Sequence, residues 1–440
     1  MGSPKFDKTD NKTLCKQDYK TLALASLGGA LEFYDFIIFV FFSLTIGKLF
    51  FPPDMPSWLS QVQTFGIFAA GYLIRPFGGI VMAHFGDLFG RKRMFTLSIL
   101  LMSLPTFLIG CLPTYETLHY AAPILLLLMR LCQGLAVGGE VPGAWTFVAE
   151  HVPKNRIGVA CGVLTSGLSL GILLGSLIST LIHGLFVGEL MNTWGWRIPF
   201  IIGGLFGFLS MYLRRWLKET PIFIEMQQRK SKEKTVKRPP VLTVLINYLP
   251  QTILSMLLTW ILSAGIMVVI LIAPIYLQEQ FNFSAMQALQ ANILAIIGLI
   301  ISCTVYGLLV DKFSLDKVLI IGSLFAAITI ACFYFSLGQY PSLLFYTYPL
   351  AGFGVGVVGC FAFFMVKVFP TEIRYSGVSF SFNMAYALAG GLTPLLLSIF
   401  TNFFSKLAPA FYVVSLFLLG ALIGVILLRQ KNNYFAKDIQ

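Results

Sequence analysis

Charged side chains are scarce in this sequence. They make up 11% of its 440 residues, against 57% hydrophobic residues, and the mean hydropathy is +0.81. Soluble domains carry roughly 25% charged residues, so a soluble globular fold is excluded. The composition is typical of a chain that crosses a membrane many times.

Residues that bind metals or carry out catalysis are also few. The seven cysteines form no C-x-x-C pair and have no ligand-like spacing to the four histidines. No nucleophile–base pair and no glycine-rich phosphate loop occurs in the sequence. We therefore predict no metal site, no cofactor and no catalytic residue, and we do not expect an enzyme.

The sequence contains many long apolar runs. A membrane-spanning helix needs about 20 apolar residues. Cutting the sequence at polar, proline and glycine breaks predicts an all-α integral membrane protein with twelve transmembrane helices. The predicted spans are 20–50, 57–85, 93–112, 118–149, 156–185, 197–217, 241–277, 285–310, 317–337, 340–368, 373–403 and 407–429.

The basic residues fall almost entirely on one side of these spans. Of the 31 Lys and Arg residues, only Lys48, Arg197 and Lys406 lie on one side. Arg75 and Arg130 lie inside spans, and all the others lie on the opposite side. Because cytoplasmic loops are enriched in Lys and Arg, both termini are predicted to be cytoplasmic. This asymmetry accounts for the net charge of +12 without a nucleic-acid partner.

The chain divides into two similar halves, a six-helix pseudo-repeat. Acidic motifs at Asp87 and Asp311 follow the second span of each half, and Pro153 and Pro370 follow the fourth. Parallel six-span halves with a site between them are typical of secondary transporters. The predicted units are a tail, a helical bundle, a basic cytoplasmic linker, a second bundle and a tail, at 1–19, 20–217, 218–240, 241–429 and 430–440.

Five charged residues lie deep inside the predicted spans, all in the N-terminal half: Glu32, Asp35, Arg75, Arg130 and Glu140. A charge at bilayer depth costs about 2.5 kcal/mol or more, so each needs a partner, a wet cavity or a proton. Helix rise places these residues near mid-depth. Three carboxylates face two guanidinium groups, so one carboxylate can carry a proton. The alternative interpretation is that they form ion pairs that only hold the bundle together.

Several stretches resemble the major facilitator superfamily. "DLFGRK", Asp87 to Lys92, is similar to its loop signature D-x-x-G-R-[RK]. Within that superfamily, the chain resembles the metabolite:proton symporter family, which carries osmolytes such as proline and betaine, and organic acids. The stretches are "ALEFYDF" (30–36), "IRPFGG" (74–79), "RLCQGLAVGGE" (130–140), "WGWRIPF" (194–200) and "LKETPIF" (217–223). The resemblance implies a major facilitator fold.

The sequence departs from the family pattern at positions that border the presumed cavity. Phe33 stands where the family usually has Trp, and Val141-Pro142 stands where Trp-Gly is usual. These departures affect the expected identity of the substrate.

Proton coupling is predicted to involve Asp35, Glu32 and Arg130. Protonation of Asp35 would release Arg130, and deprotonation would allow Arg130 to bind it again, which ties proton occupancy to the shape of the cavity. The resemblance supports a carboxylate on the first span opposite an Arg on the fourth. Glu32, one turn nearer the cytoplasm, is the alternative proton carrier.

Arg75 is the predicted anchor of the substrate, because a guanidinium group suits a carboxylate. The alternative is an ion pair with Glu140 that only locks the second and fourth spans. The predicted substrate-binding residues are Arg75, Glu140, Tyr34, Trp145, Gln133, Trp260, Asn383 and Tyr386.

Charged residues at the cytoplasmic ends of the spans form a second set. The resemblance implies a latch between the halves, and we expect Glu150 to face Arg156 and Glu372 to face Arg374. The predicted cytoplasmic gate contains Asp87, Gly90, Arg91, Lys92, Glu150, Arg156, Asp311, Glu372 and Arg374.

Together these features predict a monomeric symporter in the cytoplasmic (inner) membrane of a bacterium. It would import a small carboxylate-bearing metabolite, such as an amino acid, betaine or organic acid, with protons as the coupling ion, by alternating access. Its partners would be this small molecule and the lipid bilayer. Two alternatives are a proton-driven exporter of a small molecule or siderophore-like polycarboxylate, and a membrane sensor that does not transport.

Overall fold

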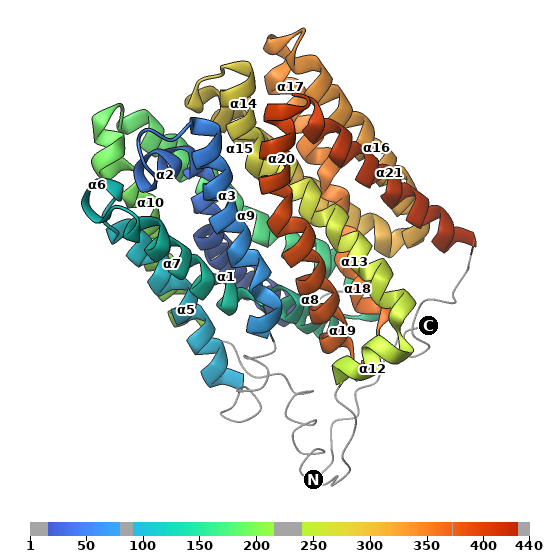
Figure 1. The fold of residues 1–440 in the computed structure, drawn as a ribbon. Coiled ribbons are helices and arrows are strands. Elements are labelled where there is room, and N and C mark those ends of the chain that lie inside the picture. The colour runs from blue at the N-terminus through green and yellow to red at the C-terminus, as the bar shows by residue number, and fades with distance from the viewer. Residues whose placement is uncertain (1–15, 80–90, 139, 215–239, 372, 430–440) are drawn as a thin grey trace.

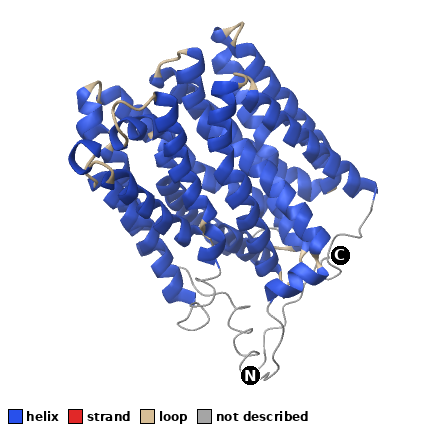
Figure 2. Cartoon of the chain, in the orientation of Figure 1, coloured by secondary structure: helices blue, strands red, loops and turns tan. Residues whose placement is uncertain are grey.

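The computed structural model describes residues 16–79, 91–138, 140–214, 240–371 and 373–429. These residues are helical almost throughout, and none of them lies in a strand (Figure 2). The predicted linker 218–240 lies outside this part of the chain except for Pro240, which begins a helix.

The first half of the chain contains long helices joined by short connections. Its helical segments are α1 (Lys16–Phe41), α2 (Ser43–Phe50), α3 (Ser57–Leu73), α5 (Arg91–Cys111), α6 (Tyr115–Leu118), α7 (Ala121–Val137), α8 (Glu140–His151), η1 (Lys154–Arg156), α9 (Ile157–Leu185), η2 (Met191–Gly195) and α10 (Arg197–Arg214).

The second half has the same character, and several of its long helices contain π or 3₁₀ turns. Its segments are α12 (Pro240–Asn247), α13 (Leu249–Ala264), η3 (Gly265–Ile272), α14 (Ala273–Phe281), α15 (Ala285–Lys312), α16 (Leu315–Leu337), η4 (Pro341–Leu343), α17 (Leu344–Val355), η5 (Gly356–Cys360), α18 (Phe361–Val368), α19 (Arg374–Ala385), η6 (Tyr386–Gly390), α20 (Gly391–Phe403) and α21 (Ala408–Arg429).

Eight continuous helical stretches of the described chain are long and apolar enough to cross a membrane. The bent pair formed by residues 25–41 and 43–50, with an angle of 59° between its parts, makes up to nine. The other predicted spans correspond in position to α3, α5 and α10, which have 17, 21 and 18 residues. The all-helical membrane class agrees with the sequence prediction, and the count of twelve stays a prediction.

Helices of the two halves lie side by side along a central boundary (Figure 1). There α9 packs along α15, α3 packs beside α20, and α8 packs against α19. We call the end of the bundle with α12 the inner end, at the bottom of Figure 1, and the end with α2 and α14 the outer end.

Glycines allow α9 and α15 to approach each other at this boundary. A Cβ added to Gly162 would lie 2.6 Å from the carbonyl oxygen of Cys303, and one added to Gly307 would lie 2.6 Å from that of Gly158. Real side chains do not reach such distances, so only glycine permits this packing. We call this contact the glycine seam. Ser166 extends it by donating to the carbonyl of Ile300 at 2.8 Å.

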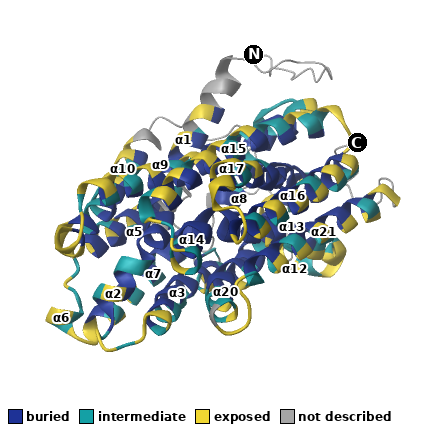
Figure 3. Ribbon diagram, turned by 90° about the horizontal axis from the view of Figure 1, so that it is seen from above, coloured by how far each residue is buried: buried dark blue, intermediate teal, exposed yellow. Residues whose placement is uncertain are grey.

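Burial follows the pattern expected of a protein in lipid. Seen from above, buried residues concentrate between the helices, and exposed residues lie largely on the outward faces and at the loops (Figure 3). Large apolar side chains such as Ile321, Ile328 and Leu422 are exposed on these faces. Such surfaces are favourable in hydrocarbon, where apolar side chains need no cover.

Candidate functional site

Asp35 lies in the interior of the N-terminal half and is 1% exposed. Its Oδ1 lies 2.8 Å from the position that a Cβ at Gly203 would occupy, and its Oδ2 lies 3.2 Å from the corresponding position at Gly207. The carboxylate therefore fills space that two glycines of α10 leave open. The hydroxyl of Ser103 and the methyl group of Thr106, both on α5, border the same positions.

Arg130 is fully buried on α7 and contacts polar and aromatic groups. Its Nη1 donates to Oε1 of Gln133 at 2.8 Å. The amide of Gln133 in turn donates to the hydroxyl of Thr106 at 2.7 Å. The guanidinium also lies over the ring of Phe39, 4.0 Å from its centre, and 5.2 Å from that of Phe68. Cation–π contacts help to hold a cation in a medium without water.

A polar chain thus leads from Arg130 through Gln133 to Thr106, beside the carboxylate of Asp35. We call these four residues the buried polar chain. It joins α7 to α5 and reaches the contact between α1 and α10. Gln133 was predicted to bind substrate, and the structure gives it this connecting position. The side chain of Glu32, the alternative proton carrier, lies outside the described residues.

Arg75 lies in an aromatic cage that both halves build. Its guanidinium carbon is 5.2 Å from the ring centre of Tyr72, 5.5 Å from that of Phe382 and 5.0 Å from that of Tyr386. Tyr72 and Tyr386 stack on each other with 5.4 Å between their centres. Arg75 is 3% exposed. The side chain of Glu140, its predicted partner, lies outside the described residues.

A pocket lies next to this cage, between the halves. We call it the inter-half pocket. Trp145 and Tyr386 line it, as predicted for the substrate site, and the indole of Trp145 donates to the hydroxyl of Thr165 at 3.3 Å. Phe33 and Val141, two positions where the sequence departs from the family pattern, also line it. The full lining is Phe33, Val141, Trp145, Thr165, Leu168, Ser169, Ile172, Leu262, Ile266, Phe382 and Tyr386.

Asn383 joins the halves close to this pocket. Its Nδ2 donates to the carbonyl of Gly138, the residue after the end of α7, and to the carbonyl of Ser379 at 3.0 Å. An amide of one half thus binds a main-chain carbonyl of the other.

Two predicted substrate contacts lie elsewhere. The hydroxyl of Tyr34 donates to the carbonyl of Pro199 at 2.9 Å, and its ring packs on Phe206 in α10, so it points into the N-terminal half. Trp260 is 38% exposed and donates to the hydroxyl of Tyr412 at 2.7 Å. Neither residue lines the inter-half pocket. Arg75, Gln133 and Asn383 are not among its lining residues either. A contact of these residues with substrate stays a prediction.

Two charged contacts connect the halves at the inner end. Arg374 Nη1 lies 3.1 Å from Oε1 of Glu150. The predicted pairing of Glu150 with Arg156 is therefore wrong, because Arg374 reaches Glu150 across the boundary where α8 meets α19. The carboxylate of Asp311 accepts hydrogen bonds from the backbone N–H groups of Gly158 at 2.7 Å and Val159 at 2.8 Å.

The Asp311 contact uses the free N–H groups at the start of α9, where the helix dipole favours a negative charge. Arg156 interacts electrostatically with the same carboxylate. Of the other predicted gate residues, Asp87, Gly90 and Glu372 lie outside the described residues. Arg91 and Lys92 begin α5, but their side chains also lie outside them.

Sequence reasoning missed Thr106, Ser103 and the two glycines that surround Asp35. A hydroxyl or a glycine in an apolar span more often serves helix packing than a site. The four-residue spacing of Gly203 and Gly207 was the available signal, because it marks a helix face that lets another group approach closely.

Comparison with known families identifies the class of protein. A family model described as Major Facilitator Superfamily matches residues 25–394. The chain belongs to the major facilitator superfamily, so it is a multi-pass membrane transporter and not an enzyme, as the sequence predicted.

Relatives of known name agree with the narrower resemblance. The chain is 32% identical over 426 residues to the "Proline/betaine transporter" of Escherichia coli (strain K12), covering 94% of this chain and 84% of that one. It is 31% identical over 431 residues to the "Glycine betaine/proline/ectoine/pipecolic acid transporter OusA" of Dickeya dadantii (strain 3937), with the same coverage of 94% and 84%.

The fold is also found among solved structures. The proton:xylose symporter XylE bound to 6-bromo-6-deoxy-D-glucose superposes with a TM-score of 0.74, over 92% of this chain and 94% of that chain. The sequence identity is 17%, so this likeness shows the fold alone.

Proposed function

We propose that the protein imports a small zwitterionic or anionic osmolyte, such as a betaine or an amino acid, together with protons. The observation that carries this proposal is the buried polar chain, in which Asp35 and Arg130 are both enclosed and hydrogen bonds run from Arg130 through Gln133 to Thr106, a neighbour of Asp35. A buried acid that exchanges its proton changes the charge within the N-terminal half. That change can alter how the half packs against its partner.

The inter-half pocket is the proposed substrate site, with Arg75 as the partner of the substrate carboxylate. The aromatic cage around Arg75 supports this role, because rings that hold a guanidinium can also hold the ammonium group of a substrate. Residues of both halves form the pocket and the cage, so binding there would couple the substrate to the relative position of the halves. The names of the relatives support the choice of substrate class.

We further propose twelve membrane spans with both termini on the cytoplasmic side, in the inner membrane of a bacterium. The separation of Lys and Arg to one side supports this arrangement. The inner end, where Glu150 meets Arg374, would then be cytoplasmic. Because the halves are joined there, the described state is closed toward the cytoplasm. We propose that the protein acts as a monomer, with no cofactor besides the coupling proton.

The test uses proteoliposomes that enclose a pH-sensitive dye and are challenged with pools of betaines, amino acids and organic acids. We expect one pool to acidify the lumen in the parent protein. Asp35→Asn should abolish that acidification, whereas Glu32→Gln should slow it less. Asp54→Asn, which alters an exposed carboxylate in the loop before α3, is the matched control and should behave like the parent.

Two results would contradict the proposal. Acidification that persists in both Asp35→Asn and Glu32→Gln would remove the first-span carboxylates from the coupling mechanism. A parent protein that is folded but moves no protons with any pool would argue against symport and in favour of export.

A further inference from the structure

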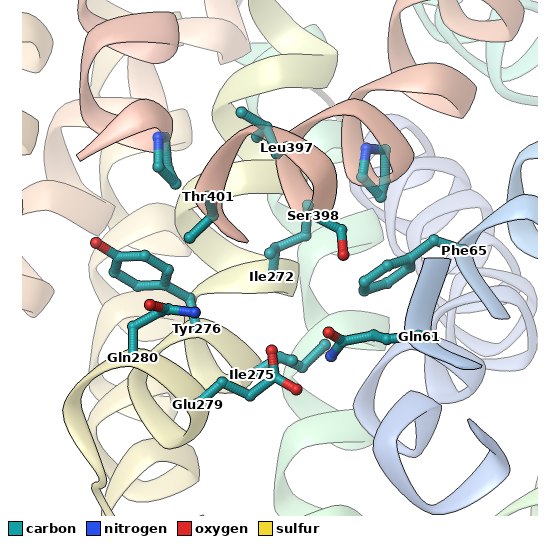
Figure 4. Close-up of a pocket in the computed structure, with 12 residues that line it drawn as sticks. Gln61, Phe65, Ile272, Ile275, Tyr276, Glu279, Gln280, Leu397, Ser398 and Thr401 are labelled. Atoms are coloured by element: carbon teal, nitrogen blue, oxygen red, sulfur yellow. The ribbon is translucent and has the colours of Figure 1, made fainter. Parts of the chain in front are cut away.

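A second pocket lies between the halves at the outer end, well away from the inter-half pocket. We call it the outer pocket (Figure 4). Gln61 and Phe65 of α3 form one wall, whereas Tyr276 and Glu279 of α14 and Ser398 of α20 form the others. Gln61 lies three turns before Tyr72 on α3, about 16 Å along the helix axis, so the outer pocket is separate from the cage around Arg75.

The charge of the outer pocket has one sign. Glu279 contributes a carboxylate at its mouth, and no Lys or Arg occurs among the described residues that line it. The rings of Phe65 and Tyr276 face the same space (Figure 4). A carboxylate beside aromatic rings favours an organic cation, because the rings attract a cation that water solvates weakly. Tyr276 is held in place because its hydroxyl donates to the carbonyl of Lys406.

Gln61 forms the wall of the outer pocket that faces Glu279. It is 4% exposed, and its amide lies toward the carboxylate of Glu279, with which it interacts (Figure 4). A cation that enters here would meet the carboxylate of Glu279 and the amide oxygen of Gln61 together, and both are acceptors.

We propose that the outer pocket is a second binding site, which takes a small molecule with an ammonium group from the outer side. Glu279 binds the ammonium, with Phe65 and Tyr276 against its alkyl groups. The hydroxyl of Thr401 offers a donor for a carboxylate on the same molecule. This site goes beyond the transport function proposed above and does not depend on proton coupling.

A natural fluorophore lies on α3, the helix that supplies one wall of the outer pocket. Trp58 stands one turn before Gln61 on α3, and its ring packs edge-on against Phe403 of α20 with 5.2 Å between the centres. Since this contact bridges the halves, a ligand below it should change the environment of the indole. The fluorescence of Trp58 therefore reports occupancy without any transport.

The experiment titrates the purified protein in lipid nanodiscs, without any gradient, with choline and with its neutral isostere 3,3-dimethyl-1-butanol. We expect saturable quenching by choline and at least about tenfold weaker binding of the neutral isostere, because the charge-assisted contact is lost. Glu279→Gln should weaken choline binding by about tenfold or more. Glu189→Gln, an exposed carboxylate in the loop after α9, is the control and should match the parent.

Trp58→Phe must remove the signal, and a response that persists in this variant would place binding elsewhere and overturn the proposal. An unchanged choline affinity in Glu279→Gln, equal binding of the neutral isostere, or no response in the parent would also overturn it. If Glu279→Gln does not fold, Gln61→Leu tests the opposite wall and should weaken choline binding about fivefold. A choline response without any proton-coupled uptake would support the outer site while the proposed transport function fails.

Discussion

Gln133 lies between Arg130 and the hydroxyl of Thr106 in the buried polar chain. Its Oε1 accepts from Arg130 while its Nε2 donates to Thr106, which borders the space occupied by Asp35. A neutral amide can pass on a change of charge at either end by shifting its two hydrogen bonds together. If Asp35 exchanges a proton, Gln133 is the group through which Arg130 would respond.

Replacing Gln133 by Leu keeps the volume similar and removes both hydrogen bonds. We expect proton-coupled uptake to fall at least about tenfold, because a buried hydrogen bond to a charged group contributes about 1.5–3 kcal/mol. The apparent Tm should fall by only a few degrees, since Arg130 keeps its contacts with Phe39 and Phe68. Uptake in proteoliposomes and thermal unfolding in detergent measure the two effects.

Gln63→Leu is the matched control, because Gln63 lies on α3 and is only half-buried. It should leave uptake near the parent rate. Parent-like uptake in Gln133→Leu would show that the buried polar chain does not take part in coupling.

At the level of helices, α9 and α15 depend on glycine where their backbones meet. Gly162→Ala would place a methyl group 2.6 Å from the carbonyl oxygen of Cys303 and 3.1 Å from the Cα of Gly307. The helices must then separate, which should lower the free energy of unfolding by about 1–3 kcal/mol. The apparent Tm of the purified protein measures this loss.

Gly66→Ala is the control, because a Cβ at Gly66 in α3 has no atom within 4 Å. An alanine in a helix interior gains about 0.5–1 kcal/mol over glycine, so the two substitutions should shift the Tm in opposite directions. A Tm change of the same sign in both would contradict the glycine seam as a close contact.

The long apolar runs were sufficient to predict where most helices lie, because the spacing of polar and turn residues divides the chain. They could not predict the bend at Phe42, the interruption near Gly138 or the π turns of η3 and η6. Such irregularities depend on contacts between helices, as Asn383 shows by binding the carbonyl of Gly138.

The candidate site was predicted only where its residues broke the apolar pattern. Asp35, Arg75 and Arg130 stood out because a charge deep in the bilayer is costly and needs a partner, a wet cavity or a proton. Trp260 gave no such signal, because a helix that is apolar all round does not indicate which face meets another helix and which meets lipid. The partner of Glu150 was also misassigned, since Arg374 is distant in sequence and close only in the fold.

At the scale of the whole molecule, the halves are held together at the inner end and leave a pocket at the outer end. Two contacts join the halves on the inner side: the ion pair of Glu150 with Arg374, and the hydrogen bonds that backbone N–H groups of α9 donate to Asp311. The free energy of these inner contacts, relative to that of the contacts at the outer end, should determine which side of the protein is open.

Glu150→Gln removes one charge of this ion pair and should move the population toward a state that is open at the inner end and closed at the outer end. Loss of a charge-assisted hydrogen bond of about 1.5–3 kcal/mol shifts such an equilibrium by about tenfold or more. Spin labels at positions 189 and 406, on outer loops of the two halves, should therefore approach each other. Pulsed electron paramagnetic resonance measures that distance, in a background whose exposed cysteines are replaced.

The charge-swapped protein with Glu150→Arg and Arg374→Glu restores the attraction and should return the distances toward those of the parent. Distances that stay the same in Glu150→Gln would mean that this ion pair does not bias the two states.

The glycine seam also limits how the protein can change over time. Where the two backbones touch, main-chain atoms set the separation of α9 and α15, and even one added methyl group would force the helices apart. The lipid-facing side chains, such as Ile321 and Leu422, have no such restriction and can vary with the membrane. Lineages that adapt to new lipids or new solutes should therefore keep the glycine seam. Their lipid-facing side chains and the residues that line the pocket should change.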